Sequence, residues 1–488
     1  MCPPSSLAAP AFGVRGKPSV ETCINIVMHR TPLAGSSATR LVEFREKLTE
    51  LVRPEGTGPF RIVKSSGGAA GGVVSEGQGY GLLLAGVTLS TQSPGTPAYR
   101  ATLSFGEELF AGWRRMCELS KGSCQDDPHL RCGGHRKRDG EAAKGFAPCL
   151  PSWAFNDDAR SQRGSGSATD GDEDALLGLM LLLQSSGPEV WPLWERTLSW
   201  TYESVRAFLR FNTKASGHGE ASVRLPRLGS CWGGLDCNNP SYIAPAHFRA
   251  FQQFTLRHGA SFGVSNGTLR EEAEAWDALV RSSYAMLDDA QCDSTGLTPN
   301  WWRPAGPVNS QGYAGCNASG TPADEFGSEA ARGVWRVALD ALWRPSRESA
   351  RYIERVSRQL TTRLDEARGE FMPLEIDVRC AAVRSVHSDW QLNPFMFAPM
   401  SAALLVPLGA STGLATRQRK ALEILSLRVA STPIDSYYSG SWIALATATL
   451  NGDFAGTCDG LFEGGCARRA RRLRALGAAD GSISVEEV

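Results

Sequence analysis

The chain has 488 residues and balances 51 Lys and Arg against 51 Asp and Glu, so its formal net charge is zero. This balance argues against a nucleic-acid partner, which selects for a basic excess, and 42% hydrophobic residues exclude a disordered chain. No uninterrupted apolar run approaches the ~20 residues that a membrane helix needs, so no membrane partner is expected.

Taken in chain order, apolar residues recur at helical spacing in segments separated by loops rich in Gly, Pro and Asn. Strand-like alternation is scarce. Successive helices without a Pro- or Ser-rich linker predict an all-α fold, either a closed double ring of helices or an α-solenoid. The predicted helices are Arg40–Val52, Gly79–Leu89, Leu103–Leu119, Asp174–Gln184, Leu193–Phe211, Pro245–His258, Leu269–Leu287, Gly333–Trp343, Ser346–Ala367, Pro394–Pro407, Thr416–Ala430 and Ser441–Asn451.

This pattern predicts one large domain over residues 39–456, with an extension at 1–38 and a tail at 457–488. The tail contains a pattern similar to half of a calcium loop, but Leu476 and Ala478 stand at two ligand positions and cannot coordinate. A polar terminus is the alternative interpretation of this segment.

The chain has 13 cysteines, several of them in close pairs or in a Cys-rich insert at about 117–150. Such usage predicts loop disulfides and an oxidising, extracellular location, although residues 1–37 show no apolar segment of a signal peptide. A zinc site could also be drawn from the cysteines and histidines of the insert. The odd total leaves at least one thiol free.

Two acidic segments stand at the starts of apolar helices. Glu76 and Tyr80 lie in a glycine-rich segment, Ser-Glu-Gly-Gln-Gly-Tyr-Gly, that runs directly into a helix. Asp170 opens a second segment, Asp-Gly-Asp-Glu-Asp, in which four acids fall within five residues. Helix capping explains one or two of these acids, but the mutual repulsion of four favours a ligand-binding role.

Two further segments combine aromatic and charged residues. Trp232-Gly-Gly is followed by Asn239-Pro-Ser-Tyr242 on a loop that leads into a helix. Farther on, Glu329 and Arg332 are three residues apart, and they are neighbours if that segment is helical. Alone, the pair would be read as a surface ion pair of little energetic consequence.

Together these four segments, in this order, resemble glycoside hydrolase family 8. The shared motifs are Ser-Glu-Gly-x-x-Tyr-Gly, Ala-Thr-Asp-Gly-Asp, Trp-Gly-Gly before Asn-Pro-Ser-Tyr, and acid-Ala-x-Arg-x-x-Trp-Arg. They run from Ser75 to Arg336, and Tyr437-Tyr438 before a later helix adds to the likeness. The resemblance implies an (α/α)6 barrel, which agrees with the helices predicted from periodicity.

The resemblance also implies roles for individual residues. Glu76 matches the general acid, Asp170 the carboxylate that binds and distorts the sugar, and Tyr242 the tyrosine that helps to hold the attacking water. Arg332 matches the arginine that orients the base. A general acid must hold its proton near neutral pH, so the pKa of Glu76 is expected to be raised by burial or by Asp170. The other expected substrate-binding residues are Trp153, Trp232, Tyr80, Tyr437 and Tyr438.

Glu329 stands where much of the family has Asp as the base. We predict Glu329 as the base, with Asp324, Glu325 and Asp389 as reserve candidates. Because of this departure, a non-catalytic β-glucan-binding protein with a degenerate base is a competing hypothesis. An α-solenoid scaffold for protein partners is a third, but it gives no reason for four such loops in the family order.

The predicted activity is inverting hydrolysis of β-1,4-glycosidic bonds by an endo-β-1,4-glucanase acting as a monomer. Chitosanase, xylanase and lichenase are alternatives within the family. The expected partner is a polysaccharide, and neither a metal nor any other cofactor is predicted.

Overall fold

The computed structural model describes residues 35–56, 58–65, 72–121, 131–132, 147–156, 159–217, 222–303, 306–307, 326–366, 393–407 and 412–462. In these ranges helices dominate, and the strands form short two-stranded antiparallel pairs. The pairs are β1 (Thr49–Val52) with β2 (Phe60–Val63), β3 (Val73–Val74) with β6 (Ala154–Phe155), β4 (Arg131–Cys132) with β5 (Ala147–Pro148), β7 (Thr213–Ser216) with β8 (Val223–Pro226), and β9 (Trp302–Arg303) with β10 (Gly306–Pro307).

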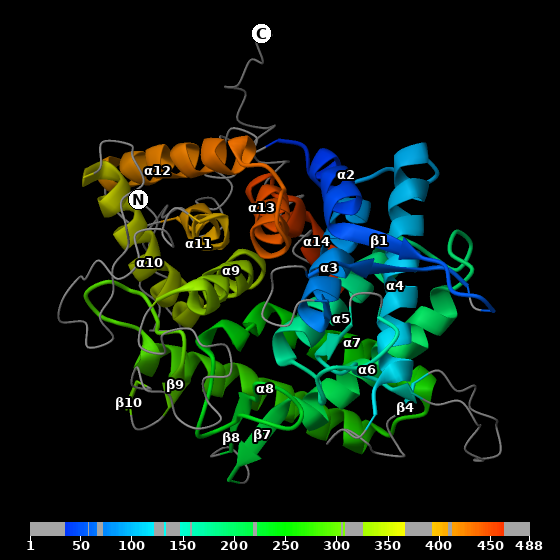
Figure 1. The fold of residues 1–488 in the computed structure, drawn as a ribbon. Coiled ribbons are helices and arrows are strands. Elements are labelled where there is room, and N and C mark those ends of the chain that lie inside the picture. The colour runs from blue at the N-terminus through cyan, green and yellow to red at the C-terminus, as the bar shows by residue number, and fades with distance from the viewer. Residues whose placement is uncertain are drawn as a thin grey trace, which may run out of the picture.

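The helices form the predicted double ring (Figure 1). Each inner helix contacts the next, and the last returns to the first: α3 (Ser75–Ser90), α5 (Thr169–Ser185), α7 (Pro245–His258), α9 (Ser328–Trp343), α11 (Pro394–Ser401) and α13 (Tyr437–Leu450). The outer helices are α2 (Ser37–Leu48), α4 (Pro97–Leu119), α6 (Trp194–Phe211), α8 (Asn266–Ala290), α10 (Arg347–Glu366) and α12 (Thr412–Ser431). Short 3₁₀ turns lie at η2 (Pro240–Tyr242), η3 (Gly259–Phe262) and η4 (Ala402–Leu405).

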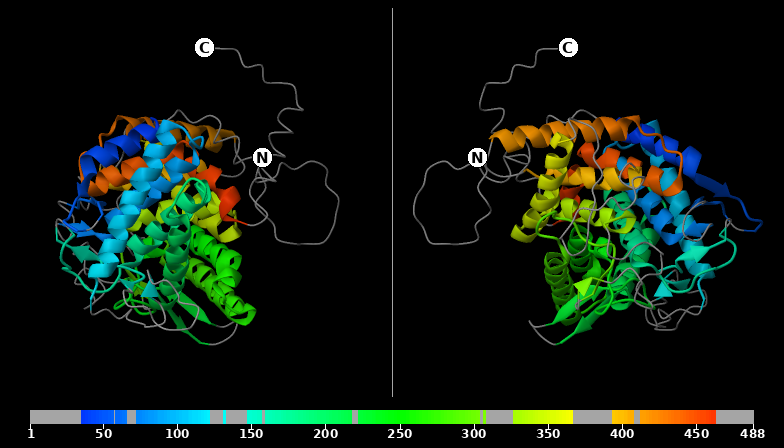
Figure 2. Two further views of the ribbon diagram at one scale, coloured as in Figure 1. Left: turned by 90° about the vertical axis from the view of Figure 1, so that its right-hand side faces the viewer. Right: turned by 60° about the vertical axis from the view of Figure 1, so that its left-hand side comes forward.

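The two rings differ in how their apolar residues are distributed. Inner helices such as α3 and α13 are buried on nearly every side, whereas outer helices such as α4 and α6 bury one face. This is the difference expected between a core helix and an amphipathic surface helix. Figure 2 shows the hairpins β7–β8 and β9–β10 at one end of the helical body.

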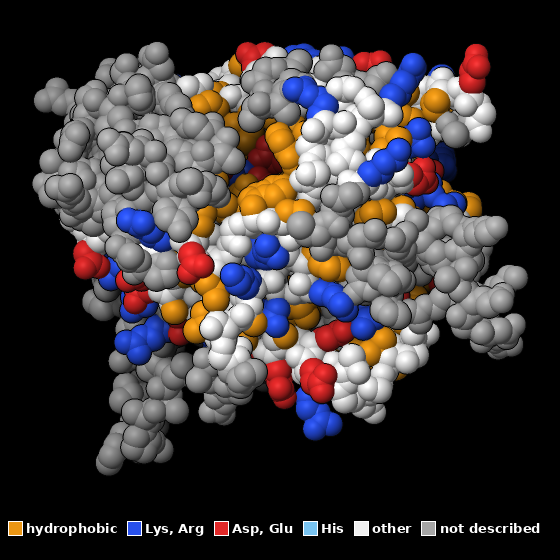
Figure 3. Space-filling model, turned by 60° about the horizontal axis from the view of Figure 1, so that its bottom comes forward, with side chains coloured by type: hydrophobic (Ala, Val, Ile, Leu, Met, Phe, Trp, Pro, Cys, Tyr) orange, Lys and Arg blue, Asp and Glu red, His pale blue; other side chains and the backbone are white. Residues whose placement is uncertain are grey.

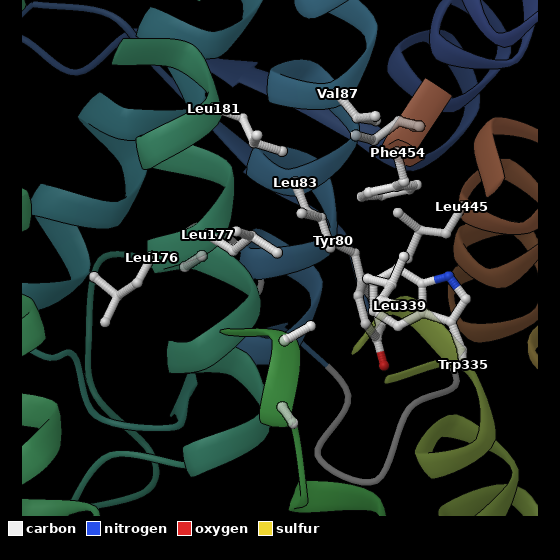
Figure 4. Packing of buried hydrophobic residues seen from close by; sticks show 14 of the residues in the cluster. Tyr80, Leu83, Val87, Leu176, Leu177, Leu181, Trp335, Leu339, Leu445 and Phe454 are labelled. Atoms are coloured by element: carbon white, nitrogen blue, oxygen red, sulfur yellow. The ribbon is translucent and has the colours of Figure 1, made fainter. Parts of the chain in front are cut away.

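A further helix, α14 (Asp453–Leu461), contacts inner helices around the ring, among them α3, α5, α9 and α13. Its Phe454 packs edge-on against Trp335 of α9, with ring centroids 5.3 Å apart (Figure 4). The predicted domain boundary between residues 456 and 457 is therefore wrong, because it cuts through a helix whose Cys458 and Leu461 are buried in the core.

The helices α3 and α5 approach one another unusually closely through glycines. A Cβ on Gly79 would lie 2.5 Å from the carbonyl oxygen of Gly171, and one on Gly178 would lie 2.4 Å from the carbonyl carbon of Leu82. Any side chain at these positions would force the helices apart. The glycines therefore set the distance between the first turns of α3 and α5, which carry Glu76 and Asp170.

The structure extends several predicted helices toward their N-termini. α3 begins at Ser75, α5 at Thr169, α9 at Ser328 and α13 at Tyr437, each four or five residues before the predicted start. In the opposite direction, the end of the predicted helix Arg40–Val52 is wrong, because its last residues form β1.

The cysteines confirm a disulfide in the insert. Cys132 and Cys149 are joined, which removes both from any thiolate zinc site, and Cys117 is a buried free thiol. Cys231, Cys237, Cys292 and Cys458 are also disulfide-bonded. The remaining candidate zinc ligands of the insert (Cys124, His129, His135), the reserve bases (Asp324, Glu325, Asp389) and the calcium-like tail lie outside the described residues. Of the helices described, none is both long and apolar enough to cross a membrane.

Candidate active site

The predicted carboxylates meet at one end of the inner ring. Each outer helix returns the chain, so the inner helices begin at the same end, and Glu76, Asp170 and Glu329 all stand in first turns. The positive end of a helix dipole stabilises a carboxylate there. On the face seen in Figure 3, a hollow holds acidic side chains at its floor beside hydrophobic ones.

Arg332 joins these carboxylates into one cluster. Its Nη1 donates to Asp170 Oδ2 at 2.7 Å and also to Glu76 Oε1. Its Nη2 donates to Glu329 Oε2, one helical turn earlier on α9, which confirms that the two residues are neighbours. The guanidinium is buried and lies over the ring of Tyr242, 5.5 Å from its centroid. One cation thus serves three carboxyl groups, and full ionisation of all three would leave negative charge uncompensated.

The surroundings of Glu76 favour its protonated form. Burial raises the pKa of Glu76 to about 7, and Asp170 adds to the rise while Arg332 opposes it. Two phenols bind the carboxyl group: Tyr80 donates to Oε1 at 2.9 Å and Tyr437 donates to Oε2. The expected raised pKa of Glu76 is confirmed, with burial as the larger cause.

Glu329 is held differently from Glu76. Its Oε2 also accepts from Asn239 Nδ2 at 2.8 Å, so two donors converge on one oxygen. Among the described residues, no hydrogen bond is made to Oε1. The side chain is 16% exposed, which leaves this second oxygen as the one open to a water molecule.

The aromatic residues fall into two groups. Trp153 and Trp232 are partly exposed, and their rings lie against Gly164 and Gly166, respectively. Tyr80 and Tyr437, also predicted as substrate contacts, are buried at 0% and 5% exposure, and their hydroxyl groups donate to Glu76. Tyr438 is partly exposed and donates to the Ser328 carbonyl at the start of α9.

Behind the carboxylate cluster lies a second buried network. Arg336 Nη2 donates to Asp174 Oδ2 at 2.7 Å, and His247 contacts the other oxygen of Asp174 at 3.0 Å. Arg336 also donates to the carbonyl of Ser241, the neighbour of Tyr242. This network explains two of the four acids at the start of α5 as structural, because Glu173 lies 2.9 Å from Arg336 as well.

Sequence reasoning missed Asn239 and the binding of Tyr437 to Glu76. Asn239 belongs to a segment singled out for its Tyr242, and its partner is 90 residues away. No local pattern reveals such a contact. Among the described residues, no group of three or more His, Cys, Asp or Glu could hold a metal ion.

The fold and the site define a class: an (α/α)6 barrel with a carboxylate cluster at the N-terminal ends of its inner helices. The family model described as glycosyl hydrolases family 8 matches residues 144–380. Among curated proteins, Endoglucanase 2 of Ruminiclostridium josui is 25% identical over 331 residues, which cover 66% of this chain and 55% of the relative. Endoglucanase A of Acetivibrio thermocellus is 25% identical over 313 residues, covering 62% and 48%.

Solved structures agree on the fold. A β-1,3-1,4-glucanase from Paenibacillus sp. X4 superposes with a TM-score of 0.60 at 15% identity, covering 89% of this chain and 93% of that one. Rex8A from Paenibacillus barcinonensis, complexed with xylose, gives a TM-score of 0.56 at 16% identity, covering 89% and 94%. The family model, the curated relatives and the solved structures together support glycoside hydrolase family 8 for this chain. The chain spans about half the length of the two curated endoglucanases.

Proposed function

We propose that this protein hydrolyses β-1,4-glycosidic bonds in a polysaccharide with inversion of the anomeric centre, and that it acts as an endo-β-1,4-glucanase. The observation that carries the proposal is the environment of Glu76. Its pKa is raised to about 7, and its carboxyl group shares the guanidinium of Arg332 with two other carboxylates. Carboxyl groups whose environments separate their protonation states are the requirement for acid and base catalysis at neutral pH.

In this mechanism Glu76 gives its proton to the leaving glycosidic oxygen. Glu329 removes a proton from a water held between its Oε1 and Tyr242, and that water attacks the anomeric carbon from the opposite face. Asp170 binds the distorted sugar. Trp153 and Trp232 stack on neighbouring sugar rings, as aromatic faces do on apolar sugar surfaces.

The β-1,4-glucan assignment is supported by the curated relatives, which are named endoglucanases. The structural neighbours include a β-1,3-1,4-glucanase and a protein solved with xylose, so mixed-linkage glucan and xylan are the alternative substrates. We further propose a secreted, monomeric enzyme, and the disulfides support an oxidising location.

The test is a panel of carboxymethylcellulose, lichenan, xylan and chitosan, with reducing ends measured over time. We expect the greatest release from carboxymethylcellulose, and proton NMR of the first products should show the α-anomer, because inversion at a β-linkage yields it. A β-anomer as the first product would contradict inversion. Glucan binding without any release would favour the non-catalytic alternative.

The pH dependence follows from the protonated role of Glu76. Burial places the pKa of Glu76 at about 7, and the general acid is active only while it carries its proton. We therefore expect kcat/KM to fall about tenfold per pH unit above pH 7. The measurement is kcat/KM on one soluble substrate from pH 4 to 9. A profile that stays flat to pH 9 would show that Glu76 is not the acid.

A further inference from the structure

Asn239 links the candidate base to the loop that carries Tyr242. The side chain is fully buried at the start of η2. Its Oδ1 accepts from the backbone N–H of Ser241 at 2.9 Å, and its Nδ2 donates to Glu329 Oε2 at 2.8 Å. Because a backbone donor occupies the oxygen end, the nitrogen end must face the carboxylate, and the amide orientation is fixed by its partners.

The packing of α9 on η2 keeps this contact in place. A Cβ on Gly333 would lie 3.1 Å from both the Pro240 carbonyl oxygen and the Ser241 Cα, so the helix runs close against the 3₁₀ turn. Glu329 and Asn239 therefore stand on two elements that cannot separate without repacking. The carboxylate is oriented by Asn239 from one side and by Arg332 from the other.

Other titratable groups also face Glu329 from the surrounding elements, so the protonation of Glu329 depends on their charges as well. They are Arg332 on α9 itself, Glu76 on α3, Tyr242 on η2 and Tyr438 on α13. Asp170 on α5 shares the guanidinium of Arg332 with Glu329. Arg332 and Asn239 are the hydrogen-bond donors to Glu329 among the described residues. Asn239 is the neutral one, so it can be replaced without removing a charge from the cluster.

We propose that Asn239 is a positioning residue for the base: it holds Glu329 Oε2 so that Oε1 faces the attacking water, and it favours the ionised carboxylate. This inference rests on the proposed function of Glu329. A donor to a carboxylate stabilises the charged form, so its loss makes the proton harder to remove. The decrease of kcat/KM on the acidic side of its pH profile, the low-pH limb, reports the deprotonation of Glu329 in the free enzyme.

The main test is Asn239→Asp. The new carboxylate can still accept from the Ser241 N–H, but it replaces the donor to Glu329 with a like charge. We expect the low-pH limb of kcat/KM to move upward by about one pH unit or more. We also expect kcat to fall by about 10- to 100-fold with little change in KM, because the water is misplaced while the sugar platforms are intact. A low-pH limb at its wild-type position would overturn the proposal.

A second variant covers the case in which Asn239→Asp does not fold. Asn239→Ser keeps a hydroxyl that caps the turn but is too short to reach Glu329. A smaller upward movement of the low-pH limb is expected, and no movement would overturn the proposal.

The matched control is Asn212→Asp. Asn212 is equally buried and donates its Nδ2 to a carboxylate, Asp172 Oδ2, at 2.7 Å, but it does not contact the Arg332 cluster. This variant should lose thermal stability while its low-pH limb stays in place. Equal movement of the low-pH limb in both variants would contradict a specific role for Asn239.

Glu329→Gln separates the role of Asn239 from the assignment of Glu329 as the base. If Glu329→Gln is inactive while Asn239→Asp keeps the wild-type low-pH limb, only the role of Asn239 fails. If Glu329→Gln is fully active, the assignment of the base fails.

Discussion

Glu76→Gln should reduce kcat on a soluble β-glucan by about two to four orders of magnitude, the contribution of a positioned general acid. Glutamine preserves the shape of the side chain and can still accept from Tyr80 and Arg332, the donors to Oε1. It has no proton to give to the leaving oxygen. The measurement is the initial rate of reducing-end release, compared with the wild-type protein at equal folded concentration.

The leaving group supplies the internal control for this variant. An aryl β-cellobioside with a strongly acidic phenol leaves without protonation, so Glu76→Gln should cost much less on this substrate than on the polysaccharide. Equal losses on both substrates would indicate that Glu76 acts by binding and not as an acid. Wild-type activity on the polysaccharide would remove Glu76 from the mechanism.

A second control replaces Tyr437, the buried phenol that donates a hydrogen bond to Glu76. Tyr437 donates to Glu76 Oε2, a bond that favours the ionised carboxylate. Its removal should therefore not mimic Glu76→Gln: in Tyr437→Phe the acid remains and holds its proton more tightly. The expected kcat loss on the polysaccharide is thus far smaller than that of Glu76→Gln.

The sequence predicted helix interiors well and helix starts poorly, and the reason is physical. Apolar periodicity marks residues that pack against other helices. The first turns of α3, α5 and α9 carry acids, and those of α3 and α5 also carry glycines; the burial of these residues depends on partners from other inner helices. The prediction therefore placed these residues before the helices, whereas the structure places them within the first turn. α14 was missed because its nine residues include two glycines and little apolar periodicity.

The motif residues also divide into pairs that local spacing predicts and pairs that only the tertiary fold brings together. Glu329 and Arg332 could be paired from their spacing alone, because three residues bring side chains together on a helix. Tyr437 and Glu76 are 361 residues apart, and only the closure of the ring by α13 against α3 brings them into contact. Family resemblance identified both segments as important, but it did not show that the phenol binds the acid.

The closeness of α3 and α5 leads to the prediction with the largest effect on stability. Gly178 lies where a Cβ would be 2.4 Å from the carbonyl carbon of Leu82 and 2.5 Å from the N of Leu83, both backbone atoms that cannot rotate away. We expect Gly178→Ala to destabilise the protein by about 3 kcal/mol, the upper part of the range for overpacking a tight core. The measurement is the free energy of unfolding in urea or guanidinium chloride.

Gly456→Ala is the matched control for this substitution. Gly456 is an exposed helical glycine of α14, and a Cβ there would meet no atom within 4 Å. Alanine should stabilise the protein by up to about 1 kcal/mol, because glycine is the poorer helix former. The two glycine-to-alanine changes are thus expected to have opposite signs, and equal effects would show that helix propensity and not interhelical distance decides the outcome.

The same substitution also tests how the scaffold positions the site. α3 and α5 carry Glu76 and Asp170 in their first turns, so a wedge at Gly178 should move these carboxylates relative to one another. A misplacement of about 1 Å can cost roughly 100-fold in rate. The folded fraction of Gly178→Ala should therefore show a lower kcat although Gly178 touches no substrate. Wild-type kcat in the folded fraction would mean that the helix spacing serves stability alone.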